Sequence, residues 1–351
     1  MSEAKMLDVK LSSNYHHVLD EDHFPSVENY LLAHPVPPAD VTFGFIKRIT
    51  KAVSNAIQEK FGDVKKYHFS DAAMEISIRY AAEGERRFEQ HLVEEGTRNQ
   101  SLMYAHLCSH HSALIAEVGH RKNDLVILKQ AYDQKVKSFR ISQQLDQARA
   151  KYERHSLAIR AAVVGKFAKN KHYLLRSIVH FQKSIDAQRN YDMAAVTASH
   201  LGLCRSYAAL IPLIPSRKQE LLEHCIHYAK RTTKLADEHY PALSTSAIDL
   251  WEESVCQLEA PFAGVEAKTL REELERRLPI HHNRGKQPNP RVFSYCIALI
   301  RKLNELFAMK EPEAVTPTPK PKKHTNPKGR ETARLERHVS EELSDYFDDD
   351  E

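Results

Sequence analysis

Glycine is scarce in this sequence, with 10 residues among 351. No two glycines lie within three positions of each other, so the loops GxGxxG, GxxxxGKS/T and GxSxG do not occur. HExxH and other defined spacings of histidine with a carboxylate are also missing. These absences exclude nucleotide binding by such loops, and they predict a protein that is not an enzyme and holds no cofactor. A chain so poor in glycine is expected to be mostly helical.

Long apolar runs are missing too. No eighteen consecutive residues are apolar, and charges are spread over the first twenty residues, so we expect neither a membrane span nor a secretory signal. The 5 cysteines are odd in number and form no CxxC pair. We expect buried, reduced thiols, as is usual in the cytosol or nucleus, at Cys108, Cys204, Cys225, Cys256 and Cys296.

Histidine is abundant, with 21 residues, and this raises the question of a metal site. The best pair is His106 with His110, because an i, i+4 spacing places both on one face of a helix. Cys108 and His111 project in other directions, and no third ligand follows at a fixed spacing. We therefore expect no metal ion.

The hydrophobic pattern divides the chain into an irregular N-terminal arm (1–39), a helical domain (40–310), a linker rich in proline and lysine (311–330) and an acidic tail (331–351). The domain begins with helices at about 40–61 and 70–96. It ends with a cap of helices at about 246–258, 265–278 and 290–309. Between them, three helical hairpins are predicted at about 101–145, 148–190 and 193–240.

An apolar stripe recurs in the second helices of these hairpins. The second hairpin carries it at Leu174, Ile178, Phe181 and Ile185, and the third carries it 47 residues later at Leu221, Cys225, Tyr228 and Thr232. In the first hairpin the same interval leads to Ile127 and Ala131, but Gln134 and Ser138 interrupt the stripe. The first helix of the second hairpin is predicted to bury Tyr152, Ile159 and Val163.

The stretch SIVHFQKSIDAQRNYDMAAVTASHLGLCRSYAAL resembles long-period tetratricopeptide-like arrays, with Phe181 and Leu201-Gly202 at recognisable places. Ser177 and Ser184 stand where that family usually has alanine, and the period of 47 exceeds the family's period of about 34. The resemblance covers residues 100–240 at most. It implies a scaffold that binds peptides or proteins without catalysis.

We therefore predict an all-α fold, with a right-handed, tetratricopeptide-like solenoid of helical hairpins between N-terminal helices and a C-terminal helical cap, followed by a disordered tail. A helical hairpin cannot bury its apolar stripes alone, so neighbouring hairpins should stack side by side. An up-down bundle of the same helices is the alternative.

The formal net charge of +4 is unevenly distributed. Residues 316–337 carry a net +5 and residues 338–351 carry −7, which leaves +6 on residues 1–315. The hairpin turns should line one edge of a solenoid, and we call their basic residues the basic ridge: Arg121, Lys122, Lys166, Lys169, Lys171, Arg217 and Lys218. A second basic cluster contains Arg276, Arg277, Arg284, Lys286 and Arg291.

The last forty residues combine two signals. Proline every few residues of the linker prevents a helix, and KPKK at Lys320–Lys323 fits a nuclear import signal, so the expected location is the cytoplasm, the nucleus or both. The tail regains an apolar stripe, which predicts an amphipathic helix that docks on the body or on a partner. The stripe consists of Leu335, Val339, Leu343, Tyr346 and Phe347.

The sequence thus predicts a scaffold or adaptor whose protein partner is acidic or presents a peptide or helix to the groove and the basic ridge. The alternative is a nucleic-acid-binding protein in which the ridge and the 276–291 loop contact phosphates. Two further interpretations are that the basic residues are simply solvated or that they meet the chain's own acidic tail. The partner's identity and the oligomeric state remain open.

Overall fold

The computed structural model describes residues 24–39, 41–57, 67–95, 98–188, 192–239, 241–260, 262–283 and 290–308. The expected all-α class is confirmed for these residues, which form twelve α-helices, two short 3-10 helices and no strand. The N-terminal helices are α2 (Phe24–Ala33), α3 (Phe43–Ile57) and α4 (Asp71–Glu95). The middle of the chain forms α5 (Arg98–Lys122), α6 (Leu125–Leu145), α7 (Gln147–Phe167), α8 (Lys171–Gln188), α9 (Met193–Leu210) and α10 (Lys218–His239). The C-terminal helices are α11 (Pro241–Val255), α12 (Phe262–Asn283) and α13 (Pro290–Leu306).

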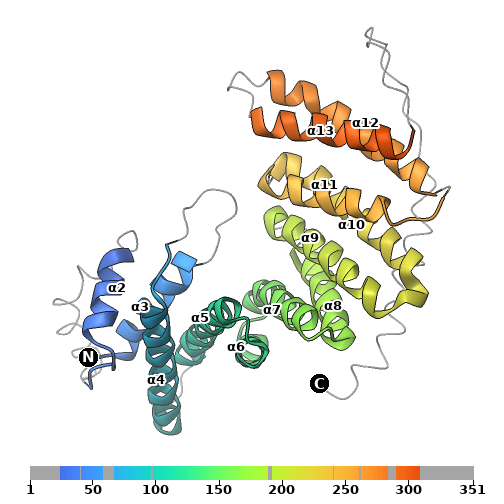
Figure 1. The fold of residues 1–351 in the computed structure, drawn as a ribbon. Coiled ribbons are helices and arrows are strands. Elements are labelled where there is room, and N and C mark those ends of the chain that lie inside the picture. Colours follow the sequence, from blue (N-terminus) through green and yellow to red (C-terminus); the bar gives the residue numbers. More distant parts are fainter. Residues whose placement is uncertain are drawn as a thin grey trace.

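The helices follow one another in chain order along a curved row (Figure 1). Each helix packs against the one before it, and the pairs α3–α5, α7–α9 and α9–α11 also contact each other. In Figure 1, α2–α4 lie at one end of the row and α11–α13 at the other. The pairs α5–α6, α7–α8 and α9–α10 occupy the three segments in which the sequence predicts hairpins.

The N-terminal arm, which was predicted to be irregular, contains a helix. Pro25 lies in the first turn of α2 and Pro35 follows its end, so the prolines flank the helix and do not interrupt it. Val27, Tyr30 and Leu31 are buried, and α2 packs on α3 and α4. The prediction of an irregular arm rested on the number of prolines in this segment. Their positions decide whether a helix forms, because proline is tolerated in the first turn of a helix and beyond its end.

The first two hairpins turn in the same way, 46 residues apart. Gly119 and Gly165 lie where their helix meets the next one so closely that a Cβ at position 165 would come within 2.7 Å of Leu174 Cγ. Four residues after each glycine the backbone has a positive φ, which is 51° at Asn123 and 48° at Lys169. Equivalent positions of the first and second hairpins are therefore 46 residues apart. This is one residue fewer than the interval of 47 that the apolar stripes in the sequence predicted.

The offset of 46 changes which residues of α6 correspond to the stripe of α8. The corresponding residues are Leu128, Tyr132, Lys135 and Phe139, all of them buried. The sequence comparison placed Ile127, Ala131, Gln134 and Ser138 there, one position too early. The interval of 47 holds between α8 and α10, where the residues of both stripes are buried. The turn before α10 differs from the turn before α8, because it contains two 3-10 helices and runs over residues 211–217, whereas the turn before α8 runs over residues 168–170.

Gly202 in α9 faces the ring of Phe181 in α8, and this contact gives a first test of the packing. A Cβ at position 202 would lie 2.5 Å from Cε1 and 2.6 Å from Cε2 of the buried ring. We expect Gly202→Ala to lower the free energy of unfolding by about 1–3 kcal/mol, because the ring must leave its position. Urea denaturation measures the change.

Gly264→Ala in α12 is the matched control, since a Cβ at this position meets nothing within 4 Å. There the substitution is expected to be neutral or stabilising by up to about 1 kcal/mol, through the higher helix propensity of alanine. Equal stability of the Gly202→Ala variant and the wild type would contradict the packing described here.

Candidate binding groove

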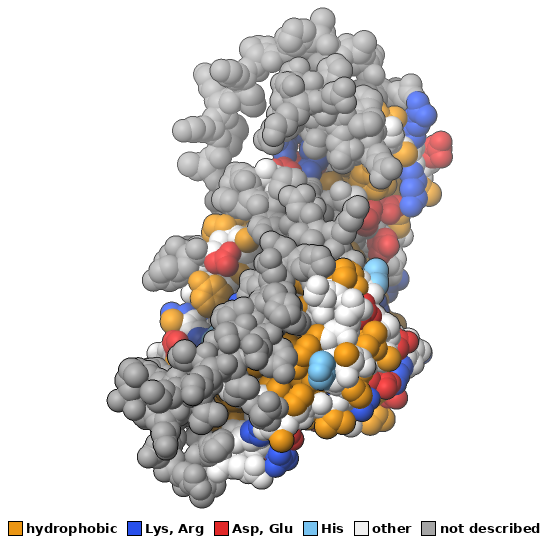
Figure 2. All heavy atoms as spheres, turned by 90° about the vertical axis from the view of Figure 1, so that its left-hand side faces the viewer, with side chains coloured by type: hydrophobic (Ala, Val, Ile, Leu, Met, Phe, Trp, Pro, Cys, Tyr) orange, Lys and Arg blue, Asp and Glu red, His pale blue; other side chains and the backbone are white. Residues whose placement is uncertain are grey.

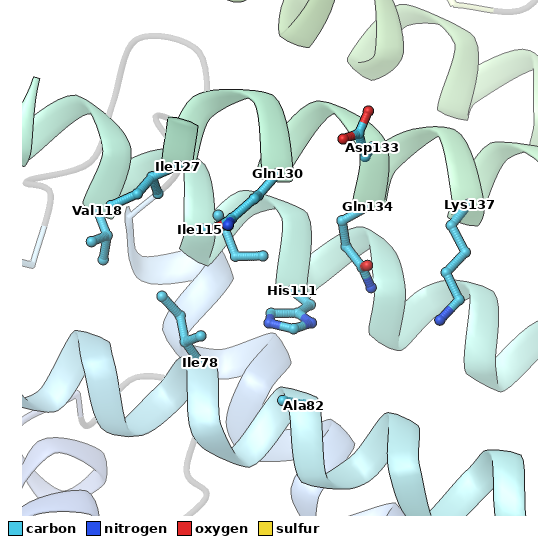
Figure 3. Close-up of a pocket in the computed structure, with 10 residues that line it drawn as sticks. All are labelled: Ile78, Ala82, His111, Ile115, Val118, Ile127, Gln130, Asp133, Gln134 and Lys137. Atoms are coloured by element: carbon cyan, nitrogen blue, oxygen red, sulfur yellow. The ribbon is translucent and has the colours of Figure 1, made fainter. Parts of the chain in front are cut away.

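A groove of about 620 Å³ lies between α4 and α6, with α5 between them (Figure 3). Its volume is in the range typical of ligand-binding clefts. Residues from all three helices line it: Ile78, Ala82, His111, Ile115, Val118, Ile127, Gln130, Asp133, Gln134 and Lys137.

The groove has an apolar end and a polar end (Figure 3). Ile78, Ile115, Val118 and Ile127 gather at one end, near the turn that joins α5 to α6. Lys137 lies at the other end, on α6. The two ends are therefore suited to different parts of a ligand, one hydrophobic and one hydrogen-bonding.

His111 lies near the middle of the groove and is 8% exposed. Its Nδ1 is 2.6 Å from Oε1 of Glu85, which also accepts a hydrogen bond from Gln134. The Nε2 atom is buried and has no hydrogen-bond partner among the described residues. A carboxylate at Nδ1 holds the proton there, so in the neutral ring Nε2 is an acceptor available to a ligand that brings an N–H or O–H group.

The polar end is held together by a chain of charged groups. Lys137 Nζ lies 3.1 Å from Glu85 Oε2 and 2.9 Å from Glu89 Oε1, and Tyr104 donates a hydrogen bond to Glu89. Burial alone would raise the pKa of Glu85, but the hydrogen bond from His111 opposes it, with help from the hydrogen bond of Gln134 and the charge of Lys137. Together they hold the pKa below its usual value. Glu85 therefore stays ionised and fixes the orientation of His111.

The sequence analysis named His111 only as a residue that fails as a metal ligand, and it missed Glu85 and Lys137. The histidine pair considered for a metal does not form a site: His110 Nδ1 is 3.1 Å from Ser54 Oγ, and His106 lies against Arg149. In the described part of the chain, no group of three or more histidine, cysteine, aspartate or glutamate side chains is arranged to hold a metal ion.

The basic ridge is not uniform. In the first turn, Arg121 pairs with Asp71 and Glu117, and Lys122 pairs with Glu75. In the third turn, Arg217 pairs with Glu220 in the first turn of α10, and Lys218 is exposed. In the middle turn the three lysines are exposed, and none forms an ion pair with a described residue: Lys166, Lys169 and Lys171. The unpaired positive charge of the ridge is thus concentrated in its middle turn.

The second basic cluster is only partly a surface feature. Arg276 is exposed and pairs with Glu273 and Asp237, whereas Arg277 is 4% exposed and bonds to Ser244 and to the carbonyl of Thr233. The assignment of Arg277 to a binding surface is therefore corrected, because its guanidinium joins α12 to α10 and α11. Arg291 lies in α13, and Arg284 and Lys286 fall outside the described residues.

Two of the three α7 residues that were predicted to be buried face solvent, and the third, Val163, is partly buried and packs against a core cluster. Tyr152 is 54% exposed and Ile159 is 39% exposed, and Phe167 at the end of the helix is 38% exposed. The helix instead buries its opposite side, which carries Leu157 and Val164 among smaller residues. An exposed apolar row on a helix of a folded protein requires an explanation.

One further face of the molecule has no single dominant kind of side chain among its described residues. Figure 2 shows the side of the molecule that lies on the left in Figure 1, and there the described basic, acidic and hydrophobic side chains are interspersed. The tail residues predicted to dock, Leu335 to Phe347, lie outside the described part. Among the helices that the structure describes, none is both long enough and apolar enough to cross a membrane.

No protein-family model matches the chain, and no curated protein matches it either. Two solved structures were found at low similarity. A structure titled "DHF58 filament" is 14% identical and the de novo designed helical repeat protein DHR64 is 15% identical. Each alignment covers 75% of this chain and 95% of the other, with a TM-score of 0.23.

Proposed function

We propose that this protein is a non-enzymatic scaffold, a solenoid of helical hairpins that binds a peptide segment of a partner protein in the groove between α4 and α6. The observation that carries the proposal is the groove itself, where an apolar end adjoins the unpartnered Nε2 atom of buried His111. Burial of a polar atom without a partner is costly, and a bound ligand removes that cost.

The two ends of the groove define the kind of segment that fits. An apolar side chain would enter between Ile78 and Ile127, and a backbone N–H or a hydroxyl nearby would donate to His111 Nε2. The free lysines of the middle turn add a positive field that speeds the approach of an acidic partner. Recognition therefore combines one anchored side chain with one directed hydrogen bond.

Nucleic-acid binding is the second candidate, and the observation that favours it is the group of exposed, unpaired lysines Lys166, Lys169 and Lys171. Phosphate contacts from such residues weaken steeply as the salt concentration rises. Of the other residues assigned to phosphate contact, Arg121 and Arg276 are already engaged by acidic side chains. The observations therefore favour a protein partner.

The test is to fill the groove without disturbing the core. Ala82 lines the groove and is exposed, so Ala82→Trp places an indole in it. We expect affinity purification of this variant with quantitative mass spectrometry to recover at least about tenfold less of the proteins that copurify with the wild type, a loss of at least about 1.4 kcal/mol in binding free energy.

Ala72→Trp is the matched control, because Ala72 is exposed on the same helix and does not line the groove. It should recover partners as the wild type does. Equal recovery with Ala82→Trp would reject the groove as the binding site. A parallel purification with nuclease distinguishes the second candidate, since partners held through nucleic acid disappear from all three samples.

A further inference from the structure

The exposed face of α7 is a hydrophobic surface that the groove does not include. We call Tyr152, Ile159, Val163 and Phe167 the α7 face. With 100° of rotation per residue, these four positions fall within about 80° of one another around the helix axis. The buried residues Leu157 and Val164 lie on the other side. Tyr152, Ile159 and Phe167 are exposed along this row, and Val163 between them is partly buried against a core cluster.

Cations without partners accompany this row. Lys166, Lys169 and Lys171 are exposed at its C-terminal end. Arg160 lies along its side, is partly buried and forms no ion pair with a described residue. Burial lowers the pKa of Arg160 to about 10, and the charge of Glu117 opposes the shift. An apolar row with unpaired cations along one side and at one end is suited to an acidic amphipathic helix.

We propose that the α7 face is the docking site of residues 335–347 of the same chain. Their apolar stripe, Leu335, Val339, Leu343 and Phe347, repeats every four residues and matches a row of this length. Seven acidic residues and no lysine or arginine lie between 338 and the C-terminus. The occupant and the site are thus complementary in both hydrophobic pattern and charge.

The connecting chain is long enough. Residues 309–334 number 26 and join the end of the described chain to the stripe. They span about 30 Å as a flexible coil and about 80 Å when extended as polyproline II helix. The path from α13 to α7 crosses the contacts α13–α12, α12–α11, α11–α9 and α9–α7. Four such steps at about 8–10 Å each amount to about 40 Å.

The charge distribution also sets the direction of the docked helix. The acidic residues of the tail concentrate at its C-terminal end, from Asp345 to Glu351, and the free lysines lie at the C-terminal end of α7. The tail helix therefore runs parallel to α7, with Leu335 near Tyr152 and Phe347 near Phe167. Docked in this way, the tail covers the free lysines and competes with any acidic partner for them.

The test is carbodiimide cross-linking of the full-length protein, which joins a lysine amine to a carboxylate in direct contact. Mass spectrometry is expected to find links from Lys166, Lys169 or Lys171 to Asp345, Asp348, Asp349, Asp350 or Glu351. In an equal mixture of ¹⁴N- and ¹⁵N-labelled protein, the linked peptides should carry a single isotope, because the contact lies within one chain.

Two double variants separate docking from chance encounters of opposite charges. Tyr152→Ser with Ile159→Ser removes the apolar row and keeps the lysines, and it should reduce the yield of these links at least tenfold. Val36→Ser with Val265→Ser is the control, because both valines are more than 60% exposed and lie elsewhere, and it should keep the yield. Links spread over other lysines, links of mixed isotope, or an unchanged yield after loss of the row would each overturn the proposal. The groove plays no part in this experiment, so its outcome is independent of the proposed function.

Discussion

Replacing Glu153 with alanine is expected to lower the free energy of unfolding by about 3–5 kcal/mol. Glu153 is 6% exposed and pairs with Lys135, which is 3% exposed, and Arg149 Nη2 lies 2.9 Å from its other oxygen. Burial alone would raise the pKa of Glu153, but the charges and hydrogen bonds of Lys135 and Arg149 outweigh it and hold the pKa below its usual value. The alanine variant leaves Lys135 as a buried charge without its anion, which is the main cost.

Two further variants show whether the unpaired charge of Lys135 causes the loss of stability in Glu153→Ala. Lys135→Met with Glu153→Leu removes both charges and keeps most of the volume, so it should recover most of the lost stability in urea denaturation. Glu75→Ala breaks the exposed pair with Lys122 and is expected to cost at most about 1 kcal/mol. A Glu153→Ala variant no less stable than Glu75→Ala would show that the Lys135–Glu153 pair is not buried as described.

This ion pair also marks a difference between otherwise equivalent hairpins. In the register set by the turns, Lys135 of α6 occupies the position of Phe181 in α8 and Tyr228 in α10, and both rings are buried. The buried ammonium group of Lys135 needs the carboxylate of Glu153, so α6 packs favourably only against a helix that supplies such a carboxylate, which is α7. We expect the pair to fix which hairpin follows which, as single buried polar residues fix the register of coiled coils.

The sequence predicts the positions of most helices because their start and stop signals are local. Gly96 was expected to end the helix that begins near Asp71, and α4 runs from Asp71 to Glu95. Asp124, Asp146 and Asp192 each accept a hydrogen bond from a backbone N–H of the helix that follows, as N-caps do. Such signals act within a few residues and need no knowledge of the rest of the fold.

The side that a helix buries is harder to predict, and α7 shows why. It carries two rows of apolar residues, and the larger side chains Tyr152 and Ile159 belong to the exposed row. The buried row includes alanines and Glu153, whose burial depends on Lys135 of another helix. A hydrophobic pattern in the sequence favours burial of the row with the larger apolar side chains. Which row is buried in the structure depends on the helices that pack against α7.

The groove could not be predicted for a related reason. Glu85, His111 and Lys137 come from three helices and are each about 26 residues apart in the sequence. No local spacing connects them, and they meet only because α4, α5 and α6 pack in order. The exposed α7 face and the acidic tail are likewise far apart in the chain, although each has a recognisable pattern of its own.

Acidification from pH 7 to pH 5 is expected to destabilise the protein strongly. Burial lowers the pKa of His155 to about 4 and that of His110 and His180 to about 3, from an ordinary value of 6.5. A histidine with a depressed pKa contributes fully to stability above pH 6.5. Below that pH the unfolded chain takes up a proton that the folded chain does not, so the contribution falls until the pH reaches the folded pKa. At pH 5 each histidine should cost about 1–2 kcal/mol, and the three together about 3–6 kcal/mol.

His155 is the position at which to test this origin, because its Nδ1 lies 2.7 Å from Ser199 Oγ and its ring packs on Phe181, contacts that an uncharged amide can partly replace. His155→Gln should reduce the loss of unfolding free energy between pH 7 and pH 5 by about 1–2 kcal/mol, because one proton fewer is taken up on unfolding. His172→Gln, at an exposed position, is the control for a histidine-to-glutamine substitution elsewhere in the chain. The buried carboxylates Glu85 and Glu153 keep their charge across this interval, because their pKa values lie below the usual value. Urea denaturation at half-unit pH steps would refute this account if His155→Gln and the wild type lost stability in parallel.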